Sequence, residues 1–190
     1  MKIIYYLFLI LMLASCSKNS SQPKNDSSMK YFETLNFKNL TDSYISKDIN
    51  IDGNKISIDL NFENNQPTTK ELKNLNQFLD KLSKTVETND SRIKSEFKSP
   101  NENSVKDYIT HHLSEISTDE LQHLIDVKDK SKTDEVRLLE KLRLKRIGIY
   151  PQDNNQYSVF DYTIGEELTQ YLIVILTDKE GKIIDITMES

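Results

Sequence analysis

The sequence predicts an α+β fold: an antiparallel sheet, built from an N-terminal hairpin and C-terminal strands, with a helical middle segment packed on one face. Three observations lead to this prediction. Apolar and polar side chains alternate from Tyr44 to Phe62 and again from Gln156 to Ile164, which is the period of a half-buried strand, and two more strands are expected at the end of the chain. Between these stretches the apolar residues recur every three or four positions, as on an amphipathic helix. Strands at both ends of a chain with helices between them favour a single sheet covered by helices.

The chain begins with the pattern of a secretory leader. Lys2 is followed by an apolar run, residues 3–13, that is too short to span a bilayer comfortably. The run leads into Leu-Ala-Ser-Cys, and this motif, which ends at Cys16, resembles a bacterial lipobox, whose cysteine is acylated when the chain is cut before it. We expect residues 1–15 to be a lipoprotein signal peptide and Cys16 to carry the lipid. The alternative is that Cys16 is a small buried residue of an N-terminal helix.

The rest of the chain divides into a tether and one domain. After Cys16 no side chain up to residue 28 is apolar enough to offset the entropy of ordering the segment. We therefore expect residues 16–28 to be the lipidated cysteine and a flexible tether that lets a domain stand off the membrane. Residues 29–190 have the length of a single α+β domain.

Composition speaks against several classes of function. The chain carries 25 Lys and Arg against 30 Asp and Glu, a net charge of −5, which argues against nucleic acid as a partner. Cys16 is the only cysteine, so its acylation would leave no thiol for disulfides or cysteine chemistry. With four Gly and no Trp, the chain offers little material for phosphate-binding loops or base-stacking platforms. We expect no cofactor.

The first structured element is a hairpin. Asp52-Gly53 is the pair that a two-residue turn prefers, because both positions need a positive φ angle. This turn predicts a register that pairs Ile45 with Leu60, Lys47 with Ile58, Ile49 with Ile56 and Ile51 with Asn54. One face of the hairpin is then apolar, with Lys47 as its one misfit, and the other face, which holds Asp59, is polar.

Capping signals divide the helical middle of the chain. A capping box at Thr68–Glu71 starts a helix that we expect to run to about Thr88 and to resume through Phe97. Further starts are predicted at Ser99-Pro100, with Pro100 as the first helical residue, and at Ser117. After an exposed charged loop, residues 126–134, a last helix over residues 136–142 is expected to lead into a strand over residues 143–150.

Three strands are predicted at the end of the chain. The stretch 156–164 places Phe160 and Tyr162 on one side and Tyr157 and Asp161 on the other. Strands over residues 171–177 and 182–188 flank a turn with Gly181. A three-residue loop predicts one shared face for Leu172, Val174, Leu176, Ile184, Ile186 and Met188.

Several stretches resemble an uncharacterised bacterial family, the domain of unknown function numbered two thousand and four. They are Lys55–Phe62, Tyr108–Leu113 with its His111-His112 pair, Gly148–Pro151, Phe160–Glu167 and Thr187–Ser190. The resemblance covers about Met29 to Ser190. It implies a single α+β domain, and it implies no catalytic residues because the family has no assigned activity. Proteins of this family often start near a Met-Lys-Tyr-Phe sequence, so the leader is a departure from the pattern.

The three histidines are candidate metal ligands or catalytic bases. His112 with Glu115, and Glu120 with His123, are each spaced to share a helix face. The second pair matches half of the Glu-x-x-His set of di-iron bundles, and the first lacks the last histidine of an inverted zinc-peptidase motif. Because both ligand sets are incomplete, we predict local hydrogen bonds for the histidines and no metal site.

Asp161, Glu166 and Glu167 are candidate paired carboxylates for acid and base catalysis. Strand alternation directs Asp161 away from Phe160, and the two glutamates follow Gly165 in a turn. A solvated face explains them more simply, so we predict no catalytic residues. Serine-nucleophile and P-loop signatures are absent from the sequence.

These observations favour a membrane-anchored bacterial lipoprotein with a non-enzymatic binding or structural role. A specific version is an immunity-type lipoprotein, which would neutralise a toxin by presenting an acidic surface to it. We expect the binding surface on the wet strand face around Tyr157, Asp161 and Tyr171. Its partners would be the membrane, through the lipid, and a protein of the cell envelope.

The sequence leaves one alternative open for where the protein is located and one for what it does. Ser17 stands where many Gram-negative lipoproteins of the inner membrane have aspartate, so the outer membrane is favoured. The rival activity is an envelope hydrolase that uses Asp161, Glu167 or the histidines. The rival location is the cytoplasm, with translation from Met29.

Overall fold

The computed structural model describes residues 29–37, 40–128 and 131–190. The predicted signal peptide, the lipidation site Cys16 and the tether all lie outside these described residues. The apolar core discussed below is the one formed by the described residues.

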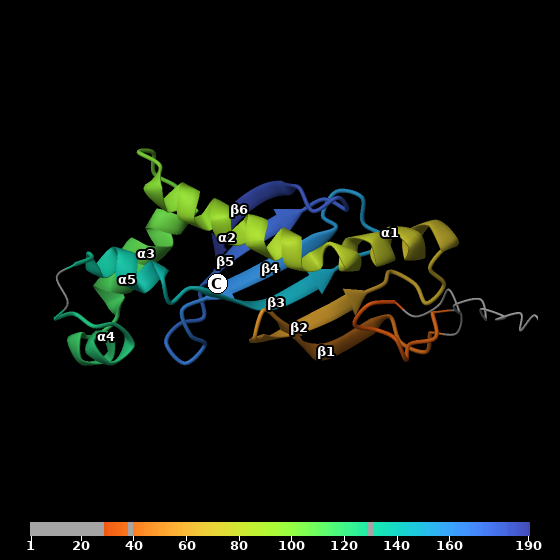
Figure 1. Ribbon diagram of the computed structural model, residues 1–190, viewed down its shortest axis with the longest axis horizontal. Helices are drawn as coiled ribbons and strands as arrows, with labels where there is room; N and C mark the ends of the chain where they lie inside the picture. Colours follow the sequence, from red (N-terminus) through yellow and green to blue (C-terminus); the bar gives the residue numbers. More distant parts are fainter. Residues whose placement is uncertain (1–28, 38–39, 129–130) are drawn as a thin grey trace, which may run out of the picture.

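A six-stranded sheet forms the centre of the molecule (Figure 1). Its strands follow the chain order and are β1 (Tyr44–Ile51), β2 (Asn54–Asn61), β3 (Arg143–Ile149), β4 (Ser158–Thr163), β5 (Leu172–Thr177) and β6 (Ile183–Glu189). The predicted α+β class is confirmed. All neighbouring strands are antiparallel except β2 and β3, which are parallel. The helical segment between them supplies the crossover connection that a parallel pair needs.

Five helices make up the middle of the chain in the described residues. They are α1 (Thr69–Asp80), α2 (Leu82–Lys98), α3 (Ser104–Glu115), α4 (Thr118–Leu124) and α5 (Asp134–Leu139). Figure 1 shows α1 and α2 running one after the other across one face of the sheet, while α3, α4 and α5 gather at one end. The core lies between the sheet and these helices, with Ile58, Leu79 and Phe160 among its fully buried side chains.

The predicted hairpin and two predicted helix starts are confirmed. Asp52 and Gly53 both adopt positive φ angles, 50° and 86°, and the four predicted pairs of the hairpin are the observed ones. Complete capping boxes form between Thr68 and Glu71 and between Ser117 and Glu120. These are the places where short-range chemistry alone decides the backbone conformation.

The predicted start of α3 was wrong. Asn103, not Ser99, caps this helix, so Pro100 lies in the preceding turn. The Asn103 side chain accepts a hydrogen bond from Lys106 N (3.2 Å) and donates one to Glu96 O (2.9 Å). One amide thereby closes α2 and opens α3, which the Ser-Pro pair cannot do.

The first helix also ends earlier than predicted, at Asp80 rather than near Thr88. Lys81 separates α1 from α2, with φ −95° and ψ 0°. Leu79 and Leu82, on either side of this break, are both fully buried. The break therefore keeps the apolar stripes of both helices on the sheet.

The predicted register of the last two strands was wrong by one residue. In the structure Ile175 lies opposite Ile186 on the helix-covered face, and Leu176 lies opposite Asp185 on the other face. The register shifts between Leu176 and Thr177, which leaves Ile184 as an extra residue with 52% of its surface exposed. A bulge of this kind moves every later side chain to the other face.

Lys47, the misfit of the predicted hairpin, is accommodated by the segment Met29–Phe37. Phe32 of this segment is buried, and the Lys47 ammonium lies 5.7 Å from the centre of its ring. The same ammonium donates a hydrogen bond to Tyr31 O at 2.6 Å. The Lys47 ammonium therefore lies at the edge of the core, where it contacts Tyr31 O and the Phe32 ring.

Candidate functional site

The face of the sheet opposite α1 and α2 is the candidate site, and we call it the open face. The observed registers and the alternation of side chains along each strand define its residues. They include Ser46, Asp48, Ser57, Asp59, Arg146, Asp161, Val174, Asp185, Thr187 and Glu189. This face carries more acidic than basic side chains.

Three charged residues from adjacent strands meet at its centre, and we call them the Asp59–Arg146–Asp161 cluster. Arg146 on β3 forms ion pairs with Asp59 on β2, at 2.6 Å, and with Asp161 on β4, at 2.8 Å. Both carboxylates are almost fully buried, with 1% and 7% of their surface exposed. About a third of the Arg146 side chain, 35%, faces solvent. One cation thus covers two anions.

Local sequence places Arg146 in this position. A bulge between Leu144 and Arg146 re-aims the strand just before the arginine. Two residues later, Gly148 leaves space beneath the guanidinium, because a Cβ atom there would come within 3.0 Å of an Arg146 terminal nitrogen. The same Cβ would lie 3.3 Å from the ring of Tyr150, the residue after β3, so the side chains of Arg146 and Tyr150 both pack close to Gly148.

The cluster has an excess of negative charge. Burial raises the pKa of Asp161, and the hydrogen bond and positive charge of Arg146 oppose this rise. Burial disfavours the charged form of Arg146, but Asp161 and Asp59 outweigh it and raise its pKa, so the arginine stays charged. With both carboxylates ionised, the three side chains sum to one negative charge, which a cation from outside can offset.

The structure does not bring together the predicted binding surface of Tyr157, Asp161 and Tyr171. Asp161 lies on the open face, but Tyr157 is 2% exposed and packs on Phe78 of α1, with ring centres 5.2 Å apart. Tyr171 packs on His111 of α3 at 4.9 Å. The prediction failed at the tyrosines because both precede their strands, where strict alternation no longer fixes the direction of a side chain.

His112 is the centre of a chain of hydrogen bonds between α3 and the β4–β5 connection. Its Nδ1 lies 2.6 Å from Tyr108 O, and its Nε2 lies 2.8 Å from the Thr169 hydroxyl. A carbonyl only accepts, so Nδ1 carries the proton and Nε2 of the neutral ring accepts from Thr169. The Thr169 oxygen in turn accepts from Tyr171 N at 3.0 Å. Burial lowers the pKa of His112, which favours this neutral form.

A polar cavity of about 350 Å³ lies beside this chain of hydrogen bonds. Its lining includes His111, His112, Glu115, Glu120 and Thr169. Within the described residues, no three His, Cys, Asp or Glu side chains are placed to hold a metal ion together. The third histidine, His123 on α4, is exposed and donates to Asp119 O at 2.6 Å, which is the local bonding predicted for it.

The residues of the rival hydrolase are also apart. Asp161 is engaged by Arg146 on the open face, and Glu167 is exposed beside Gly165. The cavity beside His112 is lined by neither of these carboxylates. A nucleophile needs a base and an activating partner within hydrogen-bond reach, and these three groups do not provide that arrangement.

Sequence reasoning missed Arg146 as a site residue. The alternation of the hairpin already assigned Asp59 to the polar face, and the spacing Arg146-x-Gly148 on a predicted strand was a usable signal. The missing step was that β2 and β3 are neighbours, since 81 residues lie between Asn61, the end of β2, and Arg143, the start of β3, and no short-range pattern joins the two strands.

The described residues contain no helix with the length and apolar character needed to span a membrane. The chain matches no known protein family, no curated protein and no solved structure.

Proposed function

We propose that this protein is a lipid-anchored module of the bacterial cell envelope that binds another protein through its open face. The single observation that carries the binding role is the Asp59–Arg146–Asp161 cluster, in which two buried carboxylates share one guanidinium on a sheet face that α1 and α2 leave uncovered. A protein partner that supplies a cation to this face would offset the remaining charge.

The anchor is supported by the sequence before the domain. Cys16 is the only cysteine and follows an apolar run and two small residues, which is the order that lipoprotein processing requires. The polar stretch after it provides reach between a membrane and the first described residues. The outer membrane is the favoured location because Ser17 follows the cysteine.

A basic protein is the partner that fits. The chain has a net charge of −5, and the open face contributes Asp48, Asp185 and Glu189 around the central cluster. Charge of one sign over a surface speeds encounter with a partner of the opposite sign and selects against others. An immunity-type lipoprotein, which neutralises a basic toxin by covering it, is the specific form of this proposal.

The anchor is tested by the mass of the N-terminal peptide of protein purified from bacterial membranes. We expect a chain that starts at Cys16 and carries acyl groups, and we expect Cys16→Ala to appear in the soluble fraction. A full-length unmodified N-terminus, or a chain that starts at Met29 in the cytosol, would reject the anchor and support the cytoplasmic alternative.

Binding is tested by cross-linking in intact cells, followed by identification of the joined protein. The variant Asp185→Lys/Glu189→Lys reverses two exposed charges of the open face, and Asp80→Lys/Glu87→Lys reverses two exposed charges on α1 and α2 as a matched control. We expect a stoichiometric basic partner that is lost in the first variant and kept in the second. A partner lost equally in both, or no partner under several growth conditions, argues against the open face.

A further inference from the structure

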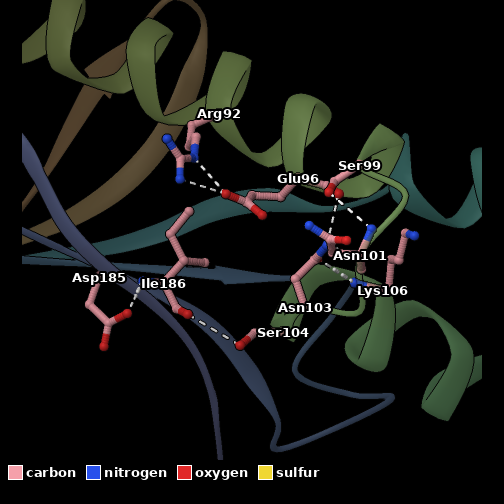
Figure 2. A network of polar contacts seen from close by, with 9 residues as sticks. All are labelled: Arg92, Glu96, Ser99, Asn101, Asn103, Ser104, Lys106, Asp185 and Ile186. Atoms are coloured by element: carbon pink, nitrogen blue, oxygen red, sulfur yellow. Dashed lines mark hydrogen bonds and ion pairs between the residues drawn. The ribbon is translucent and has the colours of Figure 1, made fainter.

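The two edge strands of the sheet, β1 and β6, are protected to different degrees. Edge strands present unpaired N–H and C=O groups that can pair with another chain, and proteins commonly block them. On β6 the outward backbone groups of Ile186 are both occupied. Its N–H donates to the Asp185 carboxylate at 2.8 Å, and its C=O accepts from the Ser104 hydroxyl at 3.2 Å (Figure 2).

Two further features obstruct β6. The start of α3 packs beside it, so that Ser104 and Asn103 lie next to the strand, as Figure 2 shows. The bulge at Ile184 interrupts the strand near its beginning. A second chain would have to displace both a helix and an internal hydrogen bond in order to pair here.

Within the part of the chain that the structure describes, no helix, bulge or side-chain hydrogen bond blocks the outward backbone groups of β1, and the segment Met29–Phe37 contacts the Lys47 side chain. The pairing of β1 with β2 continues over eight residues without a bulge, and β1 contains no proline. In a hairpin closed by a two-residue turn, the residues next to the turn form a hydrogen-bonded pair, and such pairs then alternate with non-bonded ones. The backbone groups of Tyr44, Ser46, Asp48 and Asn50 therefore point away from β2, and no described residue hydrogen-bonds to them.

The two charged side chains of β1 already have partners within the chain. An unpaired charge on an edge strand ordinarily deters another strand. Here the Lys47 ammonium is held by Tyr31 O at 2.6 Å, and Asp48 is held by Lys55 at 2.7 Å. The strand thus offers free backbone groups beside two charged side chains that are already engaged within the chain.

A second copy of the chain is the occupant that β1 itself fits. In an antiparallel pair, residues directly opposite each other point to the same face of the sheet. In a symmetric pair, one residue must therefore lie opposite its own copy, and the two-fold axis runs between these two copies. An axis at Lys47 or at Asp48 would put like charges opposite each other. An axis at Ser46 puts serine opposite serine, Ile45 opposite Lys47 and Tyr44 opposite Asp48, with no like charges paired.

We propose that β1 pairs with β1 of a second copy, antiparallel and centred on Ser46, so that the two sheets become one continuous sheet in a symmetric dimer. The contact is isologous, which closes the assembly at two chains. The dimer leaves the open face of each chain accessible. It therefore stands or falls independently of the proposed function.

The test is the dissociation constant of the dimer for the full chain, extracted from membranes in detergent and measured by analytical ultracentrifugation. Ser46→Lys places two lysines opposite each other at the axis, and we expect it to raise this constant about tenfold or more. Ser57→Lys adds the same charge on the open face one strand inward and should leave the constant unchanged. A wild-type chain that is monomeric at every concentration, or equal effects of both variants, would overturn the proposal.

A cross-link gives a second readout that does not depend on the strength of the dimer. Opposite residues of a hydrogen-bonded pair have Cα atoms about 5.5 Å apart, within the range of a disulfide. In a full chain with Cys16→Ser, we expect Ser46→Cys to oxidise to a disulfide-linked dimer and Ser57→Cys to stay monomeric. A strand-adding partner of different sequence would leave Ser46→Cys uncross-linked and would also refute self-pairing.

Discussion

Asp161 and Tyr162 are neighbours on β4, yet they illustrate two ways of burying a polar group. Asp161 is 7% exposed on the open face and is paired with a cation. Tyr162 is 1% exposed on the face covered by α2, where its hydroxyl lies near Asn89 and Asp90, and burial raises its pKa. Charged groups are concentrated on the uncovered face and neutral ones under the helices. A charge is retained where a partner can reach it, and a neutral group is sufficient where only packing is required.

The largest effect is expected from Arg146→Met, which leaves two buried carboxylates without their cation. Solvent reaches a third of this arginine and reduces the loss, so we expect a decrease of roughly 2 kcal/mol in the free energy of unfolding, measured by chemical denaturation. Adding Asp59→Asn and Asp161→Asn should recover most of it. Lys55→Met, which breaks the exposed pair with Asp48 on the same face, is the control and should change little. Equal losses of stability in Arg146→Met and Lys55→Met would mean that the buried ion pairs matter no more than the exposed one.

Lowering the pH is expected to reduce the free energy of unfolding through His112, which is a buried neutral group like Tyr162. The pKa of His112 in the folded chain lies below its ordinary value of 6.5 because burial disfavours the charge. The unfolded chain therefore binds more protons near this pH, and stability is lost as the pH falls below about 6.5. Denaturation midpoints at about pH 7.5 and 5.5 measure this loss. His112→Gln should reduce the pH dependence, whereas His123→Gln, on the exposed surface of α4, should preserve it.

A smaller effect is expected from Gly148→Ala. The added Cβ would lie 3.0 Å from a terminal nitrogen of Arg146, so the guanidinium would have to shift by a few tenths of an ångström, which weakens its contacts with the two carboxylates. Overpacking of this size costs about 1 kcal/mol when a flexible side chain can yield. The loss should largely disappear when the alanine is combined with Arg146→Met, because the clash and the ion pairs are then both gone. Additive losses in this double-mutant cycle would show that the glycine acts on something other than the arginine.

The smallest effect is expected from Tyr162→Phe. The Tyr162 hydroxyl is buried and has no well-formed hydrogen bond among the described residues. Removing it keeps the ring in the core and takes away little, so the free energy of unfolding should change by less than about 1 kcal/mol. A larger loss in denaturation experiments would mean that this hydroxyl is bonded in solution to Asn89 or Asp90, and that the helix-covered face also depends on a polar network.

Part of the fold could be predicted from the sequence alone and part could not. The hairpin register follows from Asp52-Gly53, and the caps at Thr68 and Ser117 follow from side chains three residues away, so both were predictable from local chemistry. The shift at Ile184 was not, because a bulge leaves the apolar pattern of the strand intact while changing which side chains face the core.

The candidate site was predictable only in part. Asp59 and Asp161 were each assigned to a polar face by alternation, and both lie on the open face. Their common partner Arg146 depends on β2 and β3 being adjacent and parallel, which is decided by packing of the helical segment between them. The two tyrosines of the predicted surface were drawn into contacts with α1 and α3 instead.

The parallel contact between β2 and β3 also has a consequence for how the chain acquires its structure. The β1–β2 hairpin closes over two residues and can form within microseconds, whereas bringing β3 beside β2 requires closure of a loop that contains all five described helices. Until β3 reaches β2, Asp59 lacks Arg146 as its partner. The Asp59–Arg146–Asp161 cluster would therefore be completed late in refolding, and amide protection should arise in β1 and β2 before it arises in β3.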